Sequence, residues 1–319
     1  MLGLIDPTAG TVIRDPPGGG AGYWAGAPGA FYDAREATCS LCYRLRRPRA
    51  VDPDRGFETR IATSADGVHF DDVLTLTKNQ FDSPSIEKCA LIRDDAGRWH
   101  YFVGYVDGQT GRWRIDRLEA DSIDELDPAA RSVVFTAGGL GLEGVKDPWV
   151  HRLADRYVML FSAAQAVEAT AACSHRTADI YSTGQCLSVS CLATSRDLVN
   201  WTCEGVVFAP APGKWDAYCA RLNGAVRVAN MWWAPYDGAK SVQENYEERC
   251  GLATSRDLKA WTRLSPERPL VVSPHASGSV RYAVPLLTPQ GLFVYYEFAR
   301  EDGSHDLRVL HRPAPGLRP

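Results

Sequence analysis

The 319-residue sequence has no apolar run near the ~20 residues that a membrane span needs, so we expect no membrane contact. Its N-terminus has no basic stretch followed by an apolar one, so we expect a cytoplasmic protein without a secretory signal. It also lacks a strong charge of either sign. The formal net charge is −4, which argues against holding nucleic acid by bulk charge. No helical hydrophobic period alternates with the strand-like segments, which disfavours a doubly wound α/β fold.

The cysteines lack the spacing of a metal site or a disulfide framework. There are nine, an odd number without a secretory signal, which favours reduced thiols. Cys39 and Cys42 form the single CxxC, and their segment reads as a strand. Residues three apart on a strand point to opposite faces, so zinc is not expected there.

Internal repetition is the strongest signal that is present. Ala62–Phe70, Ala193–Trp201 and Ala253–Trp261 nearly superimpose, and the last two are 60 positions apart. Each copy follows a strand-like segment, places Ser and Asp where a tight turn is expected, and returns with an aromatic residue. The motif therefore predicts a hairpin whose aromatic side chain packs beneath the next sheet.

A second repeated unit precedes each hairpin. It consists of an apolar strand, a polar turn and an aromatic-rich strand, with copies at 27–45, 86–105, 145–163, 217–233 and 280–298. Together the two units make a four-stranded meander of about 60 residues, and about five fit in the chain. We therefore predict an all-β fold, a five-bladed β-propeller of four-stranded antiparallel blades, with kelch-like repeats and a large sandwich as the competing arrangements. Residues 1–22 are expected to be a flexible lead-in, and residues 23–319 a single propeller domain.

The five units, the repeated hairpins and Lys146-Asp147-Pro148 at the start of a blade resemble the five-bladed β-propeller glycosidases of glycoside hydrolase families 43, 32, 68 and 130. The resemblance covers nearly the whole chain, about residues 23–310. It implies three acids at one end of the central channel: one opening blade 1, one opening blade 3 and one in blade 4.

The sequence matches that acid pattern in part. Asp147 matches the blade 3 acid, which in the families orients the substrate and tunes the acid's pKa. Asp216 is the nearest counterpart of the blade 4 general acid, where the usual residue is glutamate. The blade 1 position, Gly26–Gly29, has no acid, and Asp33 lies at the far end of that strand. Glu87, from the neighbouring blade, or Asp15, in the lead-in, could take its place.

The first strand of every propeller blade lines the axis, so the residues that begin these strands converge on one end of the channel. We expect the catalytic residues to be Asp147, Glu87 and Asp216. Carboxylates and cations that bond hydroxyls, with aromatic faces that stack on a sugar ring, suit a polyhydroxylated ligand. The expected substrate-binding residues are Trp24, Lys88, Lys146, Trp215, Tyr218, Arg221, Arg281 and Tyr282.

No cofactor is expected, with a structural ion in the channel as the alternative. Family 43 enzymes often have an axial histidine near a bound ion, and His275, which precedes blade 5, is the candidate ligand.

Three functions remain open. The first is cleavage of a glycosidic bond in a small glycoside, by hydrolysis or by phosphorolysis. The second is a glycosidase-like propeller used for a biosynthetic cyclisation, elimination or isomerisation of a small metabolite, which the missing blade 1 acid favours. The third is a non-catalytic sugar-binding propeller. The expected partner is a small molecule, and a closed propeller is expected to be a monomer.

Overall fold

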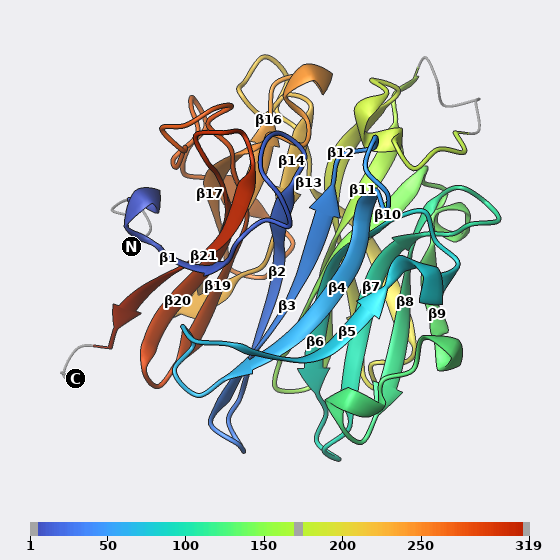
Figure 1. The fold of residues 1–319 in the computed structure, drawn as a ribbon, viewed down its shortest axis with the longest axis vertical. Coiled ribbons are helices and arrows are strands. Elements are labelled where there is room, and N and C mark those ends of the chain that lie inside the picture. Colours follow the sequence, from blue (N-terminus) through green and yellow to red (C-terminus); the bar gives the residue numbers. More distant parts are fainter. Residues whose placement is uncertain (1–5, 169–174, 315–319) are drawn as a thin grey trace.

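The computed structural model describes residues 6–168 and 175–314. In these ranges the regular elements are β-strands and short 3₁₀ helices, and the strands pair antiparallel into four-stranded units. No helix in the described ranges is both long and apolar enough to cross a membrane. Figure 1 shows blade I in front, blade V to the left and blade II to the right, with the strands running roughly up and down the page. The expected all-β five-bladed propeller is confirmed.

Four blades follow one another along the chain. Blade I contains β2 (Trp24–Asp33), β3 (Thr38–Arg47), β4 (Arg55–Ser64) and β5 (Asp71–Thr77). Blade II contains β6 (Ile86–Arg93), β7 (Trp99–Val106), β8 (Trp113–Ala120) and β9 (Ser132–Thr136). Blade III contains β10 (Gly144–Arg152), β11 (Tyr157–Ala166), β12 (Cys186–Ser195) and β13 (Trp201–Phe208). Blade IV has a divided inner strand, β14 (Cys219–Leu222) and β15 (Val226–Val228), then β16 (Met231–Ala239), β17 (Arg249–Ser255) and β18 (Trp261–Arg263).

Blade V closes the ring with a strand from the other end of the chain. It contains β19 (Val280–Thr288), β20 (Gly291–Ala299), β21 (His305–Pro313) and β1 (Thr11–Arg14), which pairs antiparallel with β21. The expectation that residues 1–22 form a flexible lead-in is therefore wrong for residues 11–14. A short segment with β-branched residues, Thr11-Val-Ile, completes the unpaired edge of the last blade.

Short 3₁₀ helices lie in the connections. They are η2 (Pro7–Ala9), η3 (Lys78–Phe81), η4 (Ile123–Glu125), η5 (Pro128–Ala130), η6 (Gly138–Leu140), η8 (Ile180–Ser182) and η9 (Val242–Glu244).

The repeated motif forms the turn that its residues predict. The Ser195 hydroxyl accepts hydrogen bonds from the backbone N–H groups of Asp197 and Leu198, and the Asp197 carboxylate accepts from the two N–H groups that follow. Ser255 and Asp257 make the same set. The aromatic residue of the hairpin packs on the preceding blade rather than the next one: Trp201 meets the Phe102 ring of blade II edge-on, with the ring centroids 5.7 Å apart.

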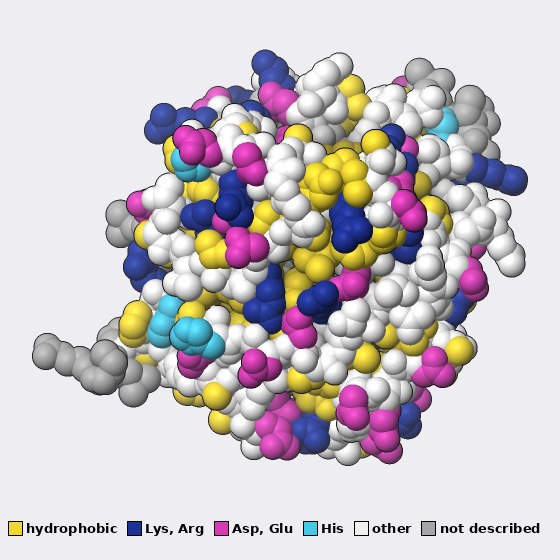
Figure 2. Space-filling model, in the orientation of Figure 1, with side chains coloured by type: hydrophobic (Ala, Val, Ile, Leu, Met, Phe, Trp, Pro, Cys, Tyr) yellow, Lys and Arg dark blue, Asp and Glu magenta, His cyan; other side chains and the backbone are white. Residues whose placement is uncertain are grey.

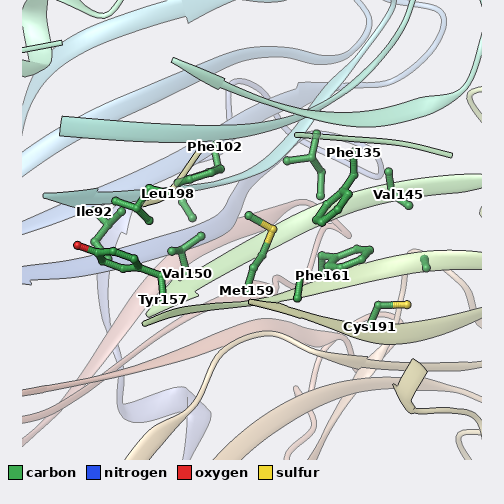
Figure 3. Packing of buried hydrophobic residues seen from close by; sticks show 14 of the residues in the cluster. Ile92, Phe102, Phe135, Val145, Val150, Tyr157, Met159, Phe161, Cys191 and Leu198 are labelled. Carbon is green, nitrogen blue, oxygen red and sulfur yellow. The ribbon is translucent and has the colours of Figure 1, made fainter. Parts of the chain in front are cut away.

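Apolar side chains fill the space between neighbouring blades. Figure 3 shows the cluster between blades II and III, where the Phe135 and Phe161 rings stack with their centroids 5.1 Å apart and Met159 lies fully buried beside them. Burial on this scale stabilises by about 25 cal/mol per Å² of apolar surface removed from water, so the blades are held as one body. On the face shown in Figure 2, acidic and basic side chains are interspersed without a field of one sign.

Candidate active site

The inner strands are irregular at the same height. β2, β6, β10 and β19 each carry a shift in pairing register, with two residues opposite one on the neighbouring strand. In blade IV the inner strand is broken at the corresponding place, between β14 and β15. Such bulges re-aim side chains and often lie beside active sites. The residues that open these irregular segments are Ala27, Glu87, Asp147, Asn223 and Tyr282.

Three of these residues adopt left-handed backbone conformations. The φ angles are +52° at Ala27, +57° at Asp147 and +52° at Tyr282. Residues other than glycine pay a steric penalty there, and such strain clusters at functional sites. The blade I position of this series is Ala27, so the structure places no carboxylate on the inner strand where the resemblance implies one. Asp33, at the end of β2, pairs with Arg93 instead.

Glu87 is the bulge carboxylate that reaches the channel mouth, with its side chain 10% exposed. Its Oε2 accepts a hydrogen bond from the Tyr282 hydroxyl at 3.2 Å and lies 3.3 Å from Arg44 Nε. Burial alone would raise the pKa of Glu87, but Arg44, Lys146, Arg46 and Arg281 outweigh it and lower that pKa. Four cations therefore act on one accessible carboxylate.

Asp147 is buried and its carboxylate has no hydrogen-bond partner among the described residues, on either oxygen. The nearest cations are Lys146 Nζ, 3.4 Å away, and Arg221 Nη1, 3.9 Å away. Lys146 Nζ also lies 3.5 Å from the Tyr282 hydroxyl. Buried polar atoms are nearly always paired, so two carboxylate oxygens without a hydrogen-bond donor are an unusual feature of this site. The structure thus brings Glu87, Asp147, Lys146 and Tyr282 together.

A buried ion network that includes residues outside the inner strands surrounds this group. Glu297, on β20, accepts from Arg281 Nε at 2.7 Å and from Arg44 Nη2 at 3.0 Å. Glu248 joins Arg281 to Arg221, at 3.0 Å and 2.5 Å respectively. Arg221 and Arg281 therefore lie at the axis as expected, but their guanidinium groups bind carboxylates of the protein.

The network contains a further carboxyl group, Asp237 on β16. It accepts hydrogen bonds from Asn223 Nδ2 at 2.7 Å and from the Tyr282 backbone N–H at 2.8 Å. Burial raises the pKa of Asp237 to about 7, because Arg221 only partly offsets the loss of water and Glu248 opposes ionisation. Sequence reasoning missed Asp237, Glu248 and Glu297, since it considered only the inner strands. An acid in an otherwise apolar strand, as in Val294–Phe298, was the available signal.

Trp24 lies at the mouth as expected, among cations. The guanidinium groups of Arg46 and Arg281 lie 4.2 Å and 4.4 Å from its ring centroid, and its ring stacks on His305 at 4.9 Å. His305 bridges Glu297 and Glu247 with its two ring nitrogens, which outweighs burial and raises its pKa. This buried histidine at the axis was also missed.

Three expected site residues lie elsewhere or face the protein. Asp216 is fully buried and binds Arg263 Nε on the outermost strand of blade IV at 2.7 Å, so it is not a channel residue. Trp215 stacks on Tyr236 and donates its indole N–H to the Ser265 carbonyl. Tyr218 donates its hydroxyl to the Tyr181 carbonyl. These side chains follow a loop that turns away from the axis before β14 begins, a course that residue spacing did not reveal.

Lys88 and His275 also differ from expectation. Lys88 is fully buried and donates to the Asn223 carbonyl at 2.6 Å, so it ties blade II to blade IV instead of facing a ligand. Its burial lowers its pKa to about 8. His275 meets Phe298 edge-on, with ring centroids 6.1 Å apart, and no cluster of three metal-ligating side chains exists in the described ranges. Asp15 pairs with Arg300 and is 79% exposed, so it does not cover the channel.

Residues from three blades cover the mouth. Asp179, in the insertion of blade III, binds Arg55 Nη2 of blade I at 2.7 Å and also binds Arg49. Tyr181 places its ring 4.9 Å from Lys146 Nζ, and Tyr246 of blade IV packs against Arg46. The charged residues of the site are therefore buried beneath these contacts rather than displayed on an open rim.

No family model matches the sequence, and no curated protein matches it. The fold is similar to solved structures at low identity. A β-1,2-mannobiose phosphorylase from Listeria innocua, in complex with β-1,2-mannobiose, is 15% identical over 93% of this chain and 92% of its own, with a TM-score of 0.61. A thermostable family-43 glycoside hydrolase is 12% identical over 92% and 91%, with a TM-score of 0.64.

A third structure comes from glycoside hydrolase family 130. This family of mannoside phosphorylases is described as containing glycoside hydrolases that target β-1,2 mannosidic linkages in Candida mannan. The third structure is 15% identical over 96% of this chain and 87% of its own, with a TM-score of 0.60. The fold is thus the propeller fold of glycoside hydrolase families 43 and 130, which was the expected resemblance.

Proposed function

We propose that this protein is a carbohydrate-active enzyme that cleaves a glycosidic bond in a small glycoside by transferring the glycosyl group to inorganic phosphate. The observation that carries the proposal is the set of four cations, Arg44, Arg46, Lys146 and Arg281, that act on Glu87 at the mouth. A neutral sugar needs hydroxyl partners and an aromatic face, whereas an anionic co-substrate needs concentrated positive charge.

Arg46 is the cation best able to receive an anion. It makes no ion pair or side-chain hydrogen bond with the described residues, and its Nε is buried without a partner. Burial lowers the pKa of Arg46 to about 10, with Arg44 and Arg281 acting in the same direction against Glu87. An anion between Arg46 and Lys146 would relieve this unfavourable desolvation and repulsion. Phosphate has the charge and the acceptor oxygens for that place.

Phosphorolysis also agrees with the missing acid of blade I. Hydrolysis normally uses two carboxyl groups, one to protonate the leaving oxygen and one to activate water or attack the sugar. With phosphate, a phosphate oxygen forms the new bond to the anomeric carbon, the bond from that carbon to the glycosidic oxygen breaks, and one protein acid protonates the departing oxygen. Alanine at position 27 is then tolerated.

We assign the proton donor to Glu87 and substrate orientation to Asp147. Glu87 has a mostly buried side chain, 10% exposed, and a phosphate dianion beside it would offset the cations that now hold its pKa low. The unpaired oxygens of Asp147 are suited to accept hydrogen bonds from sugar hydroxyls. Tyr282 and Trp24 supply the aromatic faces next to these groups.

The test is a product analysis on a panel of disaccharides, including β-mannosides, with and without phosphate. We expect glycosyl phosphate to form only when phosphate is present, and the rate to fall about 100-fold or more in Glu87→Gln and Asp147→Asn. Asp216→Asn is the matched control and should retain the wild-type rate, because Asp216 lies away from the channel. Phosphate-independent release of reducing sugar would identify a hydrolase instead. No reaction on any sugar would favour the biosynthetic alternative.

A further inference from the structure

The opposite end of the axis contains a cavity that the glycosidic site does not use. It has a volume of about 380 Å³ and is lined by residues from the far ends of the inner strands of blades I, II, III, IV and V. Proteins bind small molecules in concave sites of roughly 300–1,000 Å³. We call this cavity the axial pit. Its lining includes Phe31, Tyr32, Trp149, His151, Arg227 and Leu286.

The wall of the axial pit is a preformed aromatic stack. The Trp149 and His151 rings are stacked, 5.3 Å apart with a 3° angle between their planes, and Trp232 meets His151 edge-on at 5.3 Å. Gly224 holds Trp149 in place from behind, since a Cβ at Gly224 would come 2.8 Å from the indole ring. A planar ring that enters the pit can therefore pack against a fixed wall without ordering flexible side chains.

Polar groups in the pit lack partners among the described residues. His151, the Trp149 indole N–H and the Tyr32 hydroxyl make no side-chain hydrogen bond in those ranges. Burial lowers the pKa of His151 to about 4, so its ring is neutral at pH 7 and offers one donor and one acceptor. These groups can orient a ligand within an otherwise apolar pit.

The charged residues that line the axial pit are all basic. Its lining contains Arg152 and Arg227 and no acidic residue. Arg152 binds Asp95, whereas Arg227 is exposed and has no ion-pair partner in the described ranges. An apolar, aromatic pit with one unpaired arginine at its rim is complementary to a flat ring that carries an anion.

From this geometry we infer that the axial pit binds a small aromatic carboxylate, with its ring packed against the apolar lining of the pit and its carboxylate paired with Arg227. The pit and the glycosidic site lie at opposite ends of the inner strands, so this inference does not rest on the proposed function. Leu287, 52% exposed at the rim, lies where the ring would enter.

The probe is 2-naphthoate, followed by isothermal titration calorimetry, with 2-naphthamide as its uncharged match. We expect one saturable site for 2-naphthoate, weaker binding of the amide, and affinity that falls with added salt. Arg227→Gln should weaken 2-naphthoate about 3- to 10-fold, as expected for a partly exposed ion pair, and leave the amide unchanged. Arg268→Gln, another exposed arginine of the same blade-IV chain segment, is the control and should bind as wild type does.

Leu286→Trp narrows the pit at a partly buried position and should abolish binding of both probes while the melting temperature stays near wild type. The inference is overturned if neither probe binds at millimolar concentration, or if Leu286→Trp binds 2-naphthoate normally. Competition by phosphate would place the probe at the glycosidic site. Sedimentation that shows a wild-type dimer and a Leu286→Trp monomer would assign the pit to a second copy of the chain, which also overturns it.

Discussion

Replacing Glu297 by glutamine should be among the most destabilising conservative changes in the molecule. Glu297 is fully buried and neutralises Arg281, Arg44 and His305, with contacts of 2.7, 3.0 and 2.7 Å. Glutamine keeps the shape but removes the charge, so two buried guanidinium groups lose a shared counter-ion and His305 loses a charged hydrogen-bond partner. Breaking a buried ion pair from one side costs about 3–5 kcal/mol.

That cost converts into a measurable shift in melting temperature. With an unfolding entropy of about 2.1 cal/mol/K per residue, a 319-residue chain loses roughly 1.5 °C per kcal/mol, so Glu297→Gln should melt about 4–8 °C lower. Differential scanning calorimetry at pH 7 measures this. Glu301→Gln, an exposed glutamate in the turn before β21, is the control and should change the melting temperature by less than 1 °C.

A double variant separates charge loss from simple disruption. Arg281→Met combined with Glu297→Met removes both members of the ion pair, and the pair should lose less stability than the sum of the two single changes. A Glu297→Gln protein that melts within 1 °C of wild type would refute the reasoning, because the network would then not be a stabilising element of the axis.

Three further predictions concern the same structure. Burial lowers the pKa of His305, but its two glutamate partners outweigh burial and raise that pKa overall. Protonated His305 therefore stabilises the fold below the unfolded-state pKa of about 6.5, and this stabilisation is lost as pH rises above the folded-state pKa. The stability deficit of His305→Gln, measured by urea unfolding, should shrink from pH 6 to pH 9. Ser195→Ala removes the acceptor of two backbone N–H groups and should cost about 1 kcal/mol, whereas Ser241→Ala, whose side chain makes no capping hydrogen bond, should cost less than half of that in the same assay. Asp147→Asn breaks no hydrogen bond and removes only two long ion pairs, to Lys146 at 3.4 Å and Arg221 at 3.9 Å, so it should lower the melting temperature less than Glu297→Gln does, even though it removes turnover. An equal loss of stability would mean that Asp147 is structural.

The repeats were enough to predict the fold because the hydrogen bonds that hold their turns join residues close in the sequence. The Ser and Asp side chains that hold Ser195–Asn200 lie within a few residues of the N–H groups they bind, so spacing alone predicts the hairpins. The closing strand was missed because Thr11–Arg14 pairs with Val309 and its neighbours, almost 300 residues away, and no local pattern reports that contact.

The candidate site also contains residues that the sequence pattern predicts and residues that it does not. Blade periodicity brings four residues near the starts of the inner strands to one end of the axis: Glu87, Lys146, Asp147 and Tyr282. Asp216 also precedes an inner strand, but it binds Arg263 of the outermost strand, a choice set by side-chain packing. No motif marks the remaining acids: Asp237 and Glu297 lie on second strands, and Glu248 lies in the connection just before β17.

The most direct test of the account is the rate of glycosidic bond cleavage as a function of phosphate concentration, on the best substrate of the disaccharide panel. We predict a rate near zero without phosphate that saturates as phosphate is added, with Arg46→Gln raising the phosphate concentration needed for half-saturation and leaving that for the sugar unchanged. A cleavage rate that is independent of phosphate, in wild type and in Arg46→Gln alike, would contradict the claim that the cations at the mouth bind the attacking anion.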